Sequence, residues 1–272
     1  SVVHVRLMTS PLPPPFIFVE GVRNFRDFGV YPTQSGQTVQ AGKLFRSAND
    51  AQVTDAGRAK FRETGIKVVV DLRRSQEREM QPSQLDGLEV EILSSSLGDG
   101  DGVTLPPHLQ FIRDSDLTQQ ATHDHMMSSY RRIPWEPQHL TLFSETFDRL
   151  AEGKGPVVIH CAAGKDRTGI LCGLILYALG VDLERIEHDY LLTNHVAHDP
   201  NLLAQYAMMM GNQFDKHIDP DALMPMVGVH QDFLVEAWAE MARRDGGLDG
   251  YLERLGVDAA KKRALADYLL TA

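Results

Sequence analysis

Short apolar runs alternate along the chain with longer stretches that have the spacing of helices. Residues 66–71 and 156–160 are short, apolar and rich in β-branched side chains, as in buried parallel strands, and 88–93 alternates like another strand. Helical periodicity, capping residues and glycine stops predict helices at 54–64, 119–132, 137–151, 168–179 and from 182 to about 194. Strands that alternate with helices predict an α/β domain, with a mostly parallel sheet flanked by helices.

The N-terminal part of the chain lacks this alternation. Residues 1–15 end in a cluster of prolines, which predicts an extended lead-in with little core of its own. Residues 16–47 combine short apolar runs with turn-forming residues and predict small strands, with a hairpin tip at Ser35-Gly36.

Two later regions complete the expected organisation. Residues 98–118 contain closely spaced glycines and a Pro-Pro pair, which predicts a long irregular loop. The chain beyond about 194 is expected to be mostly helical, with Gly246-Gly247 separating two C-terminal helices. We therefore expect a single domain over 16–272 with a helical C-terminal portion.

Composition narrows the classes of partner. Hydrophobic residues make up 43% of the 272 residues and charged residues 24%, which is ordinary for a soluble globular protein. The net charge of −10 argues against nucleic acid and anionic membranes as partners. No apolar run is long enough for an integral membrane segment, and no signal peptide is evident, so a cytoplasmic location is expected. Secretion without a recognisable signal stays open, as does the oligomeric state.

The segment after the predicted strand at 156–160 carries the candidate chemistry. It reads His160-Cys161-Ala162-Ala163-Gly164-Lys165-Asp166-Arg167-Thr168-Gly169. A tight loop between a strand and a helix N-terminus directs successive backbone N–H groups, and the positive end of the helix dipole, toward one point. Such a nest binds phosphate and favours the thiolate of Cys161, while the Arg167 guanidinium can add two parallel hydrogen bonds. The other cysteine, Cys172, lies in an apolar helix and is expected in the core.

Several other stretches resemble one bacterial family of protein-tyrosine phosphatases, which belongs to the Cys-x5-Arg superfamily. They are Arg23-Asn24-Phe25-Arg26-Asp27-Phe28-Gly29, Leu44-Phe45-Arg46-Ser47, Val70-Asp71-Leu72-Arg73, the Lys-Asp-Arg loop, and Gly247-Leu248-Asp249-Gly250-Tyr251-Leu252. The resemblance runs from about residue 20 to the end. It implies hydrolysis of phosphomonoesters without a metal or cofactor. It also implies relaxed specificity for phosphotyrosine, sometimes phosphoserine or phosphothreonine, and phosphoinositides. Val30 departs from the family, which usually has glycine there, so the turn after Asp27 is expected to differ.

The proposed roles follow from the loop and the resemblance. Cys161 is the expected nucleophile, and Arg167 with the backbone N–H groups of the loop, including Ala162, Ala163 and Gly164, is expected to bind phosphate. The chain has no Trp-Pro-Asp tripeptide to supply a general acid, so Asp166, where the family offers an aspartate, is the candidate; alternatively it only orients the loop.

Other residues keep two interpretations each. Lys165 contacts a second phosphate or is a solvated charge. Thr168 stabilises the thiolate or caps the helix. Asp71 follows a strand and, by the resemblance, forms an active-site wall or binds the loop. His160 is expected to fix the loop by hydrogen bonds rather than to transfer protons.

Further polar residues have structural alternatives. Arg23, Arg26 and Arg46 anchor the substrate or loop, or form buried salt bridges. Glu136, within Trp135-Glu136-Pro137, is expected at a helix start. Histidines that invite a metal hypothesis do not match a standard site, so we expect no metal; they are His123, His125, His188, His195 and His198.

Competing functions remain at this point. The first is a protein-tyrosine or dual-specificity phosphatase acting on a phosphorylated protein. The second is a phosphoinositide or inositol-phosphate phosphatase, which extra anion binding by Lys165 would favour. A silent phosphate-binding module is disfavoured, because Cys161, Asp166 and Arg167 are all present. A rhodanese-like sulfur transferase also uses a loop cysteine, but the framework of Gly164 and Arg167-Thr168-Gly169 fits phosphate better.

Overall fold

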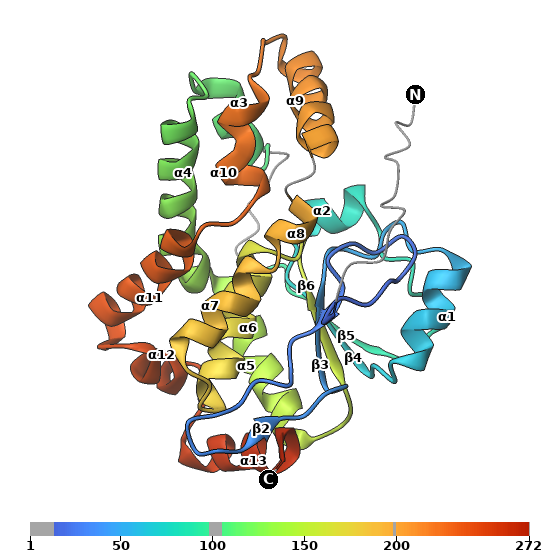
Figure 1. Cartoon of the computed structure of the whole chain (residues 1–272), viewed down its shortest axis with the longest axis vertical. Coiled ribbons are helices and arrows are strands. Elements are labelled where there is room, and N and C mark those ends of the chain that lie inside the picture. Colours follow the sequence, from blue (N-terminus) through green and yellow to red (C-terminus); the bar gives the residue numbers. More distant parts are fainter. Residues whose placement is uncertain (1–13, 98–104, 198–199, 272) are drawn as a thin grey trace.

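The main sheet lies at the centre of the molecule in a computed structural model that describes residues 14–97, 105–197 and 200–271 (Figure 1). Among these residues, the five strands of this sheet are ordered β1-β3-β6-β4-β5. Their bounds are β1 Arg26–Asp27, β3 Leu44–Ser47, β6 Val157–His160, β4 Val68–Asp71 and β5 Glu91–Leu93. The last four are parallel and β1 pairs with β3 in the antiparallel sense, which confirms the mostly parallel α/β sheet.

The register of the sheet decides what meets at its carboxyl edge. His160 at the end of β6 pairs with Ser47 at the end of β3 and with Asp71 at the end of β4. The loops that follow these three strands therefore begin side by side at the carboxyl edge of the sheet. Ligands bind at this edge in open α/β sheets, and the residue after β6 is Cys161.

Apolar side chains cover both faces of the sheet, because successive residues of a strand point to opposite sides. Val69 and Val158 pack in one core cluster with Phe61 of α1 (Asp55–Glu63). Val70 and Ile159 belong to the other, larger cluster, with side chains of α5 (Pro137–Glu152) and α6 (Asp166–Ala178). Strands buried on both faces explain why the sequence shows continuous apolar runs there.

Helix α6 is buried nearly all round. It lies between the sheet and further helices, as Figure 1 shows, and contacts α7, α11 and α12. The remaining helices are α2 Ser75–Met80, α3 Pro107–Asp114, α4 Gln119–Arg132, η1 Ile133–Trp135, α7 Leu183–Leu191, α8 Asn194–Ala197, α9 Pro200–Phe214, η2 Pro220–Leu223, α10 Met224–Val227, α11 Gln231–Asp245, α12 Leu248–Arg254 and α13 Ala259–Leu269. No helix among the described residues has both the length and the apolar composition that a membrane crossing requires.

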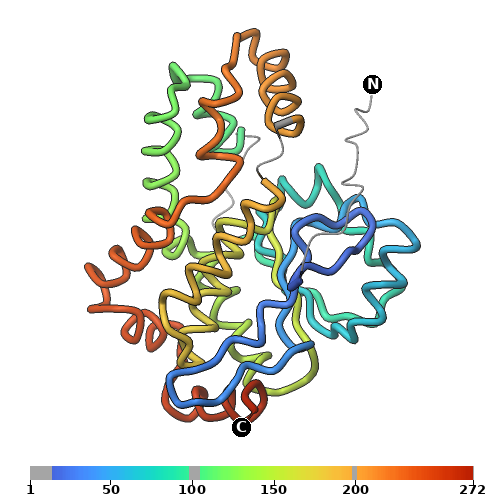
Figure 2. Tube along the Cα trace, in the orientation of Figure 1, coloured from blue at the N-terminus to red at the C-terminus, as the bar shows by residue number. Residues whose placement is uncertain are grey.

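Two helical segments that are far apart in sequence form a layer beyond the carboxyl edge of the sheet. In Figure 2 the green segment with α3 and α4 runs beside the orange segment with α9 and α10. Helix α4 contacts η2, α10 and α11. This layer places parts of α4 and of the 224–230 segment beside the loop that begins at Cys161.

Most predicted helices and turns are present, with small shifts of their ends. Thr54 caps α1 by accepting from the Gly57 N–H at 3.1 Å, as expected. The hairpin tip at Ser35-Gly36 is confirmed, and the Thr33 N–H donates across it to the Gln37 carbonyl at 2.8 Å. The predicted helix from 182 to about 194 is divided, because α7 ends at Leu191 and α8 begins at Asn194.

Other sequence predictions were wrong. Residues 107–114 of the predicted 98–118 loop form helix α3, because Pro107 starts a helix whose Ile112 is fully buried. Near the C-terminus, where only helices were expected, β7 (Leu270–Thr271) pairs with β2 (Thr38–Val39). Residues 1–13 of the predicted lead-in and 98–104 of the predicted loop lie outside the described residues.

Val30 adopts a backbone that usually belongs to glycine. Its φ is +59°, in the left-handed region where a β-branched side chain is strained, and the side chain is 54% exposed. Its N–H donates to the Val39 carbonyl at 2.8 Å, which holds the turn in place. The chain thus keeps a glycine-type turn although the residue is valine.

Candidate active site

Cys161 lies directly after β6, and helix α6 begins five residues later at Asp166. The side chain of Cys161 is buried, with 2% of its surface exposed. Residues 161–165 therefore form the predicted tight loop between a strand and a helix N-terminus, at the carboxyl edge of the sheet.

Side chains from other strands and loops hold the carbonyl groups of this loop. The Ala162 carbonyl accepts from the Asn49 side-chain Nδ2 at 2.9 Å and from the Asn49 backbone N–H at 3.2 Å. The Gly164 carbonyl accepts from Asn24 Nδ2 at 3.0 Å and from Arg46 Nη2 at 3.1 Å. In a planar trans peptide the N–H points opposite to the carbonyl. The N–H groups that follow these carbonyls therefore point away from the scaffold, as a phosphate-binding nest requires.

Gly164 is required by both conformation and space. Its φ is +66°, and a Cβ at this position would lie 2.1 Å from the Ser47 carbonyl oxygen. No side chain fits there, because the obstacle is the backbone at the end of β3.

A buried ionic group stands behind the loop. Asp189 of α7 accepts from Arg46 Nη1 at 2.7 Å, and its carboxylate lies 3.4 Å from Arg26 Nε. Burial lowers the pKa of Arg26 to about 10, whereas for Arg46 the attraction of Asp189 opposes burial and the pKa is raised. Arg46 is thus both a loop anchor and a buried salt-bridge partner, and Arg26 forms a salt bridge and donates to the Asn24 side chain. Arg23 is exposed.

Arg167, in the first turn of α6, pairs with a residue that sequence analysis missed. Its Nη1 and Nη2 donate to the two carboxylate oxygens of Glu77 at 2.6 and 2.8 Å, and Nη1 also donates to the Leu72 carbonyl at 3.1 Å. Burial raises the pKa of Glu77, but Arg167 outweighs this and lowers it to about 2. Glu77 holds the guanidinium from one side, so the edge formed by Nε and Nη2 can still meet a phosphate.

A chain of two tyrosines holds Asp166. The Tyr130 hydroxyl donates to Asp166 Oδ1 at 2.6 Å, and the Tyr190 hydroxyl lies 2.7 Å from the Tyr130 hydroxyl. A hydroxyl has one hydrogen, so Tyr190 donates to Tyr130. Burial, together with the charge of Asp166, raises the pKa of both tyrosines well above 10, and they stay protonated donors at neutral pH. Neither tyrosine carried a sequence signal, since each lies in a helix far from the loop in sequence.

Lys165 is buried rather than solvated. Its Nζ donates to the Gly228 carbonyl at 3.0 Å and to the Met226 carbonyl, and it lies 3.5 Å from Asp166 Oδ2. The side chain therefore connects the loop to the end of α10 and to the residue that follows this helix.

The other candidates near the loop lie as follows. Asp71 accepts hydrogen bonds from Arg73 Nε at 2.9 Å and from Arg73 Nη2 at 2.7 Å. Burial raises the pKa of Asp71, but the interactions of its carboxylate with His160 and Arg73 outweigh burial, and the pKa is lowered. His160 Nε2 lies 3.8 Å from Asp71, and its Nδ1 lies 3.3 Å from the Cys161 carbonyl. Thr168 is fully buried, and its hydroxyl has no hydrogen-bond partner among the described residues.

Cys172 lies in the core and Glu136 at a helix start, as the sequence predicted. Cys172 is fully buried in the core, and burial raises its pKa to about 12. Glu136 is the residue before the first turn of α5 and pairs with Arg74 at 2.9 Å and Arg132 at 2.9 Å. The two histidines of the 123–125 segment point in different directions. His125 stacks on Phe111, whereas His123 faces Asp232 of α11.

Together, the sheet, the loop and the cysteine–arginine pair define a class of α/β protein that carries a Cys-x5-Arg loop at the carboxyl edge of its parallel strands. Comparison with known proteins agrees. The profile described as "Tyrosine phosphatase family" matches residues 17–271. The triple specificity protein phosphatase PtpB of Mycobacterium tuberculosis is 31% identical over 275 residues, covering 92% of this chain and 97% of PtpB. A tyrosine-protein phosphatase of Nostoc commune is 28% identical over 236 residues, covering 83% and 74%.

The chain therefore belongs to the tyrosine phosphatase family, and the resemblance read from its motifs is confirmed. A crystal structure of P. aeruginosa TpbA in complex with pTyr is also similar, at 19% identity and a TM-score of 0.30 over 70% of this chain and 89% of TpbA.

Proposed function

We propose that this protein hydrolyses phosphotyrosine in proteins through a phosphocysteine intermediate on Cys161. The observation that carries the proposal is the arrangement of the loop. Asn24, Asn49 and Arg46 fix its carbonyls outward, while Arg167 stands at its helical end with one edge of its guanidinium available.

The proposed reaction has two steps. The Cys161 thiolate attacks phosphorus, a sulfur–phosphorus bond forms, and the bond from phosphorus to the leaving oxygen breaks. The leaving oxygen takes a proton from Asp166. Water then attacks phosphorus and gives a proton to the Asp166 carboxylate, the sulfur–phosphorus bond breaks, and phosphate and the thiolate are released. Arg167 and the loop N–H groups bind the three non-bridging oxygens throughout, where negative charge must be stabilised.

Asp166 is the proposed general acid because of its place beside the loop. Its side chain is 21% exposed, so a leaving oxygen can reach it, and the Tyr130 hydroxyl fixes one of its two carboxyl oxygens. In this proposal Tyr130 and Tyr190 position the acid and do not transfer the proton themselves.

The range of substrates is the second part of the proposal. PtpB is named a triple specificity phosphatase, and by similarity we extend the proposed activity to phosphoserine and phosphothreonine. The alternative of a phosphoinositide phosphatase depended on Lys165 as a second anion site. In the present arrangement Lys165 Nζ is bound to backbone carbonyls, which supports the protein substrate over the lipid. Parallel assays on phosphopeptides and soluble phosphoinositides test this, and a large preference for the lipid would reverse the order.

Hydrolysis of an aryl phosphate by matched cysteine variants tests the nucleophile. Cys161→Ser should lose activity to the uncatalysed background, because a serine hydroxyl is not ionised at neutral pH. Cys172→Ala is the control: Cys172 is buried in α6, and its loss should leave the turnover of the folded protein close to wild type. Activity that survives in Cys161→Ser would show that another group attacks phosphorus.

Variation of the leaving group tests the acid. Asp166→Asn should slow the hydrolysis of alkyl phosphates more than that of activated aryl phosphates, because a poor leaving group depends more on protonation. Equal slowing across a series of leaving groups would place the proton donor elsewhere.

A further inference from the structure

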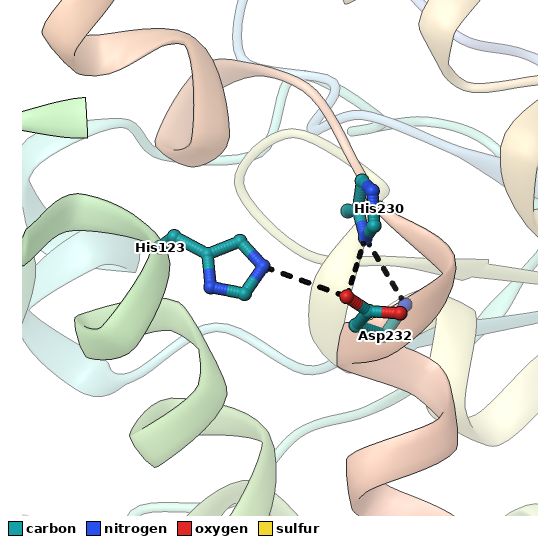
Figure 3. A group of neighbouring side chains, drawn as sticks. All are labelled: His123, His230 and Asp232. Atoms are coloured by element: carbon teal, nitrogen blue, oxygen red, sulfur yellow. Dashed lines mark hydrogen bonds and ion pairs between the residues drawn. The ribbon is translucent and has the colours of Figure 1, made fainter. Parts of the chain in front are cut away.

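A group of two histidines and one aspartate lies where α4 meets the start of α11 (Figure 3). His123 comes from α4, His230 is the residue just before α11, and Asp232 is in the first turn of α11. Asp232 Oδ2 lies 3.2 Å from His230 Nδ1 and 3.8 Å from His123 Nε2. The possible ligand atoms of all three residues lie within 4.8 Å of one another.

We propose that these three residues bind one divalent transition-metal ion of the zinc type. Two imidazole nitrogens and a carboxylate oxygen are a ligand set that zinc prefers, with water as the fourth ligand. Ligand atoms on one tetrahedral zinc, bound at ~2.0–2.1 Å, are about 3.3 Å apart. The distance from Asp232 to His230 already has this value, and the distance from Asp232 to His123 needs to shorten by about half an ångström.

The surroundings of His123 support a metal ligand. Its other nitrogen, Nδ1, is buried and has no hydrogen-bond partner among the described residues. Asp124 Oδ1 lies 3.8 Å from it, close enough for a small rotation to make the hydrogen bond by which a carboxylate orients a metal-bound imidazole. The ring of Phe233 packs against His123 at a centroid distance of 5.1 Å and limits how the imidazole can turn.

A helix cap explains only part of the group. His230 Nδ1 accepts from the Asp232 N–H at 3.3 Å, a long hydrogen bond that caps α11. Because an imidazole nitrogen has one lone pair, a metal ion bound to Nδ1 would replace this hydrogen bond. That role does not require His123, which comes from another helix and is directed at the same carboxylate oxygen (Figure 3). The side chains of His230 and Asp232 are 55% and 49% exposed, so an ion from solvent can reach the site.

Bound metal would connect two elements beside the loop at 161–167. Helix α4 carries Tyr130, which donates to Asp166, and the backbone just before His230 supplies the Gly228 carbonyl to Lys165. A shared ion would fix these supports relative to each other. The importance of this link for catalysis rests on the proposed function, whereas metal binding itself does not.

Calorimetric titration of the metal-free full chain with zinc chloride tests the proposal. The titration uses Cys161→Ser protein, so that zinc on the candidate nucleophile does not contribute and lost activity does not affect the result. We expect one zinc per chain. His123→Phe, which keeps the ring packing, and His230→Ser, which keeps a capping side chain, should each weaken binding by more than ~100-fold, since loss of a carboxylate behind a ligand alone costs about 10–100-fold.

Two further variants test the supporting carboxylate and the specificity of zinc binding. Asp124→Asn should weaken binding about 10-fold, and His217→Ala, an exposed histidine outside the group, should leave it unchanged. Circular dichroism checks that each variant is folded. The proposal is overturned if the parent protein binds no zinc, or if folded His123→Phe and His230→Ser proteins bind it as tightly as the parent.

Discussion

Replacing Glu77 by glutamine isolates the ionic contact that holds Arg167. Glutamine keeps the shape of the side chain and removes its charge. The carboxylate accepts two parallel hydrogen bonds from Arg167, at 2.6 and 2.8 Å, and one from the Arg74 N–H at 2.8 Å. The side chains of Glu77 and Arg167 are only 13% and 16% exposed, so solvent screens this pair weakly.

The magnitude follows from the pKa of Glu77. Lowering it from 4.5 to about 2 in the folded protein corresponds to about 3 kcal/mol of stabilisation. Because the folded pKa lies below the unfolded one, this stabilisation is fully present above about pH 4.5 and is lost as the pH falls toward 2. Glu77→Gln should therefore lower the free energy of unfolding by ~2–3 kcal/mol at pH 7 and by only about 1 kcal/mol at pH 3.

Urea unfolding of wild type and Glu77→Gln at a series of pH values measures this difference. Glu91→Gln is the matched control, because Glu91 pairs with Arg149 at the surface, where loss of an ion pair costs ~1 kcal/mol or less. The KM of Glu77→Gln for an aryl phosphate should also rise, since Arg167 loses its orientation.

A Glu77→Gln protein that is no less stable than Glu91→Gln at pH 7 would refute a stabilising charge at Glu77. A difference from wild type that does not shrink as the pH is lowered to 3 would refute it as well, because a pH-independent loss would come from packing rather than charge.

Three further changes test other parts of the structure. Val30→Gly should raise the free energy of unfolding by ~0.5–1 kcal/mol in thermal unfolding, because relief of left-handed strain exceeds the entropy cost of glycine; Val235→Gly, in a helix at the same 54% exposure, should lower it. Gly164→Ala should abolish aryl phosphate hydrolysis, since a Cβ would lie 2.1 Å from a backbone oxygen, and near-normal activity would contradict the role of this turn. Tyr130→Phe should destabilise the protein by ~1–3 kcal/mol and reduce turnover most for substrates with poor leaving groups, because Asp166 loses its hydrogen-bond donor. An equal reduction for all leaving groups would show that Tyr130 does not act through the proposed acid, Asp166.

Local sequence patterns predicted the central strands and the loop well. The apolar runs around Val69 and Val158 identified strands buried on both faces, because such strands need no polar side. The same patterns failed at 107–114, where proline marks the first turn of a helix as readily as a loop. They also failed at 270–271, because a two-residue strand exists only through its partner at 38–39.

By itself, the sequence determined the loop from Cys161 to Arg167, since one short segment supplies the cysteine thiol, the backbone N–H groups and the guanidinium. Only the tertiary structure decided what holds this loop. Glu77 and Tyr130 reach it from helices far away in the chain, and His123 meets Asp232 in the same way. Such contacts depend on how helices pack over the sheet, and the spacing of residues along the chain does not record packing.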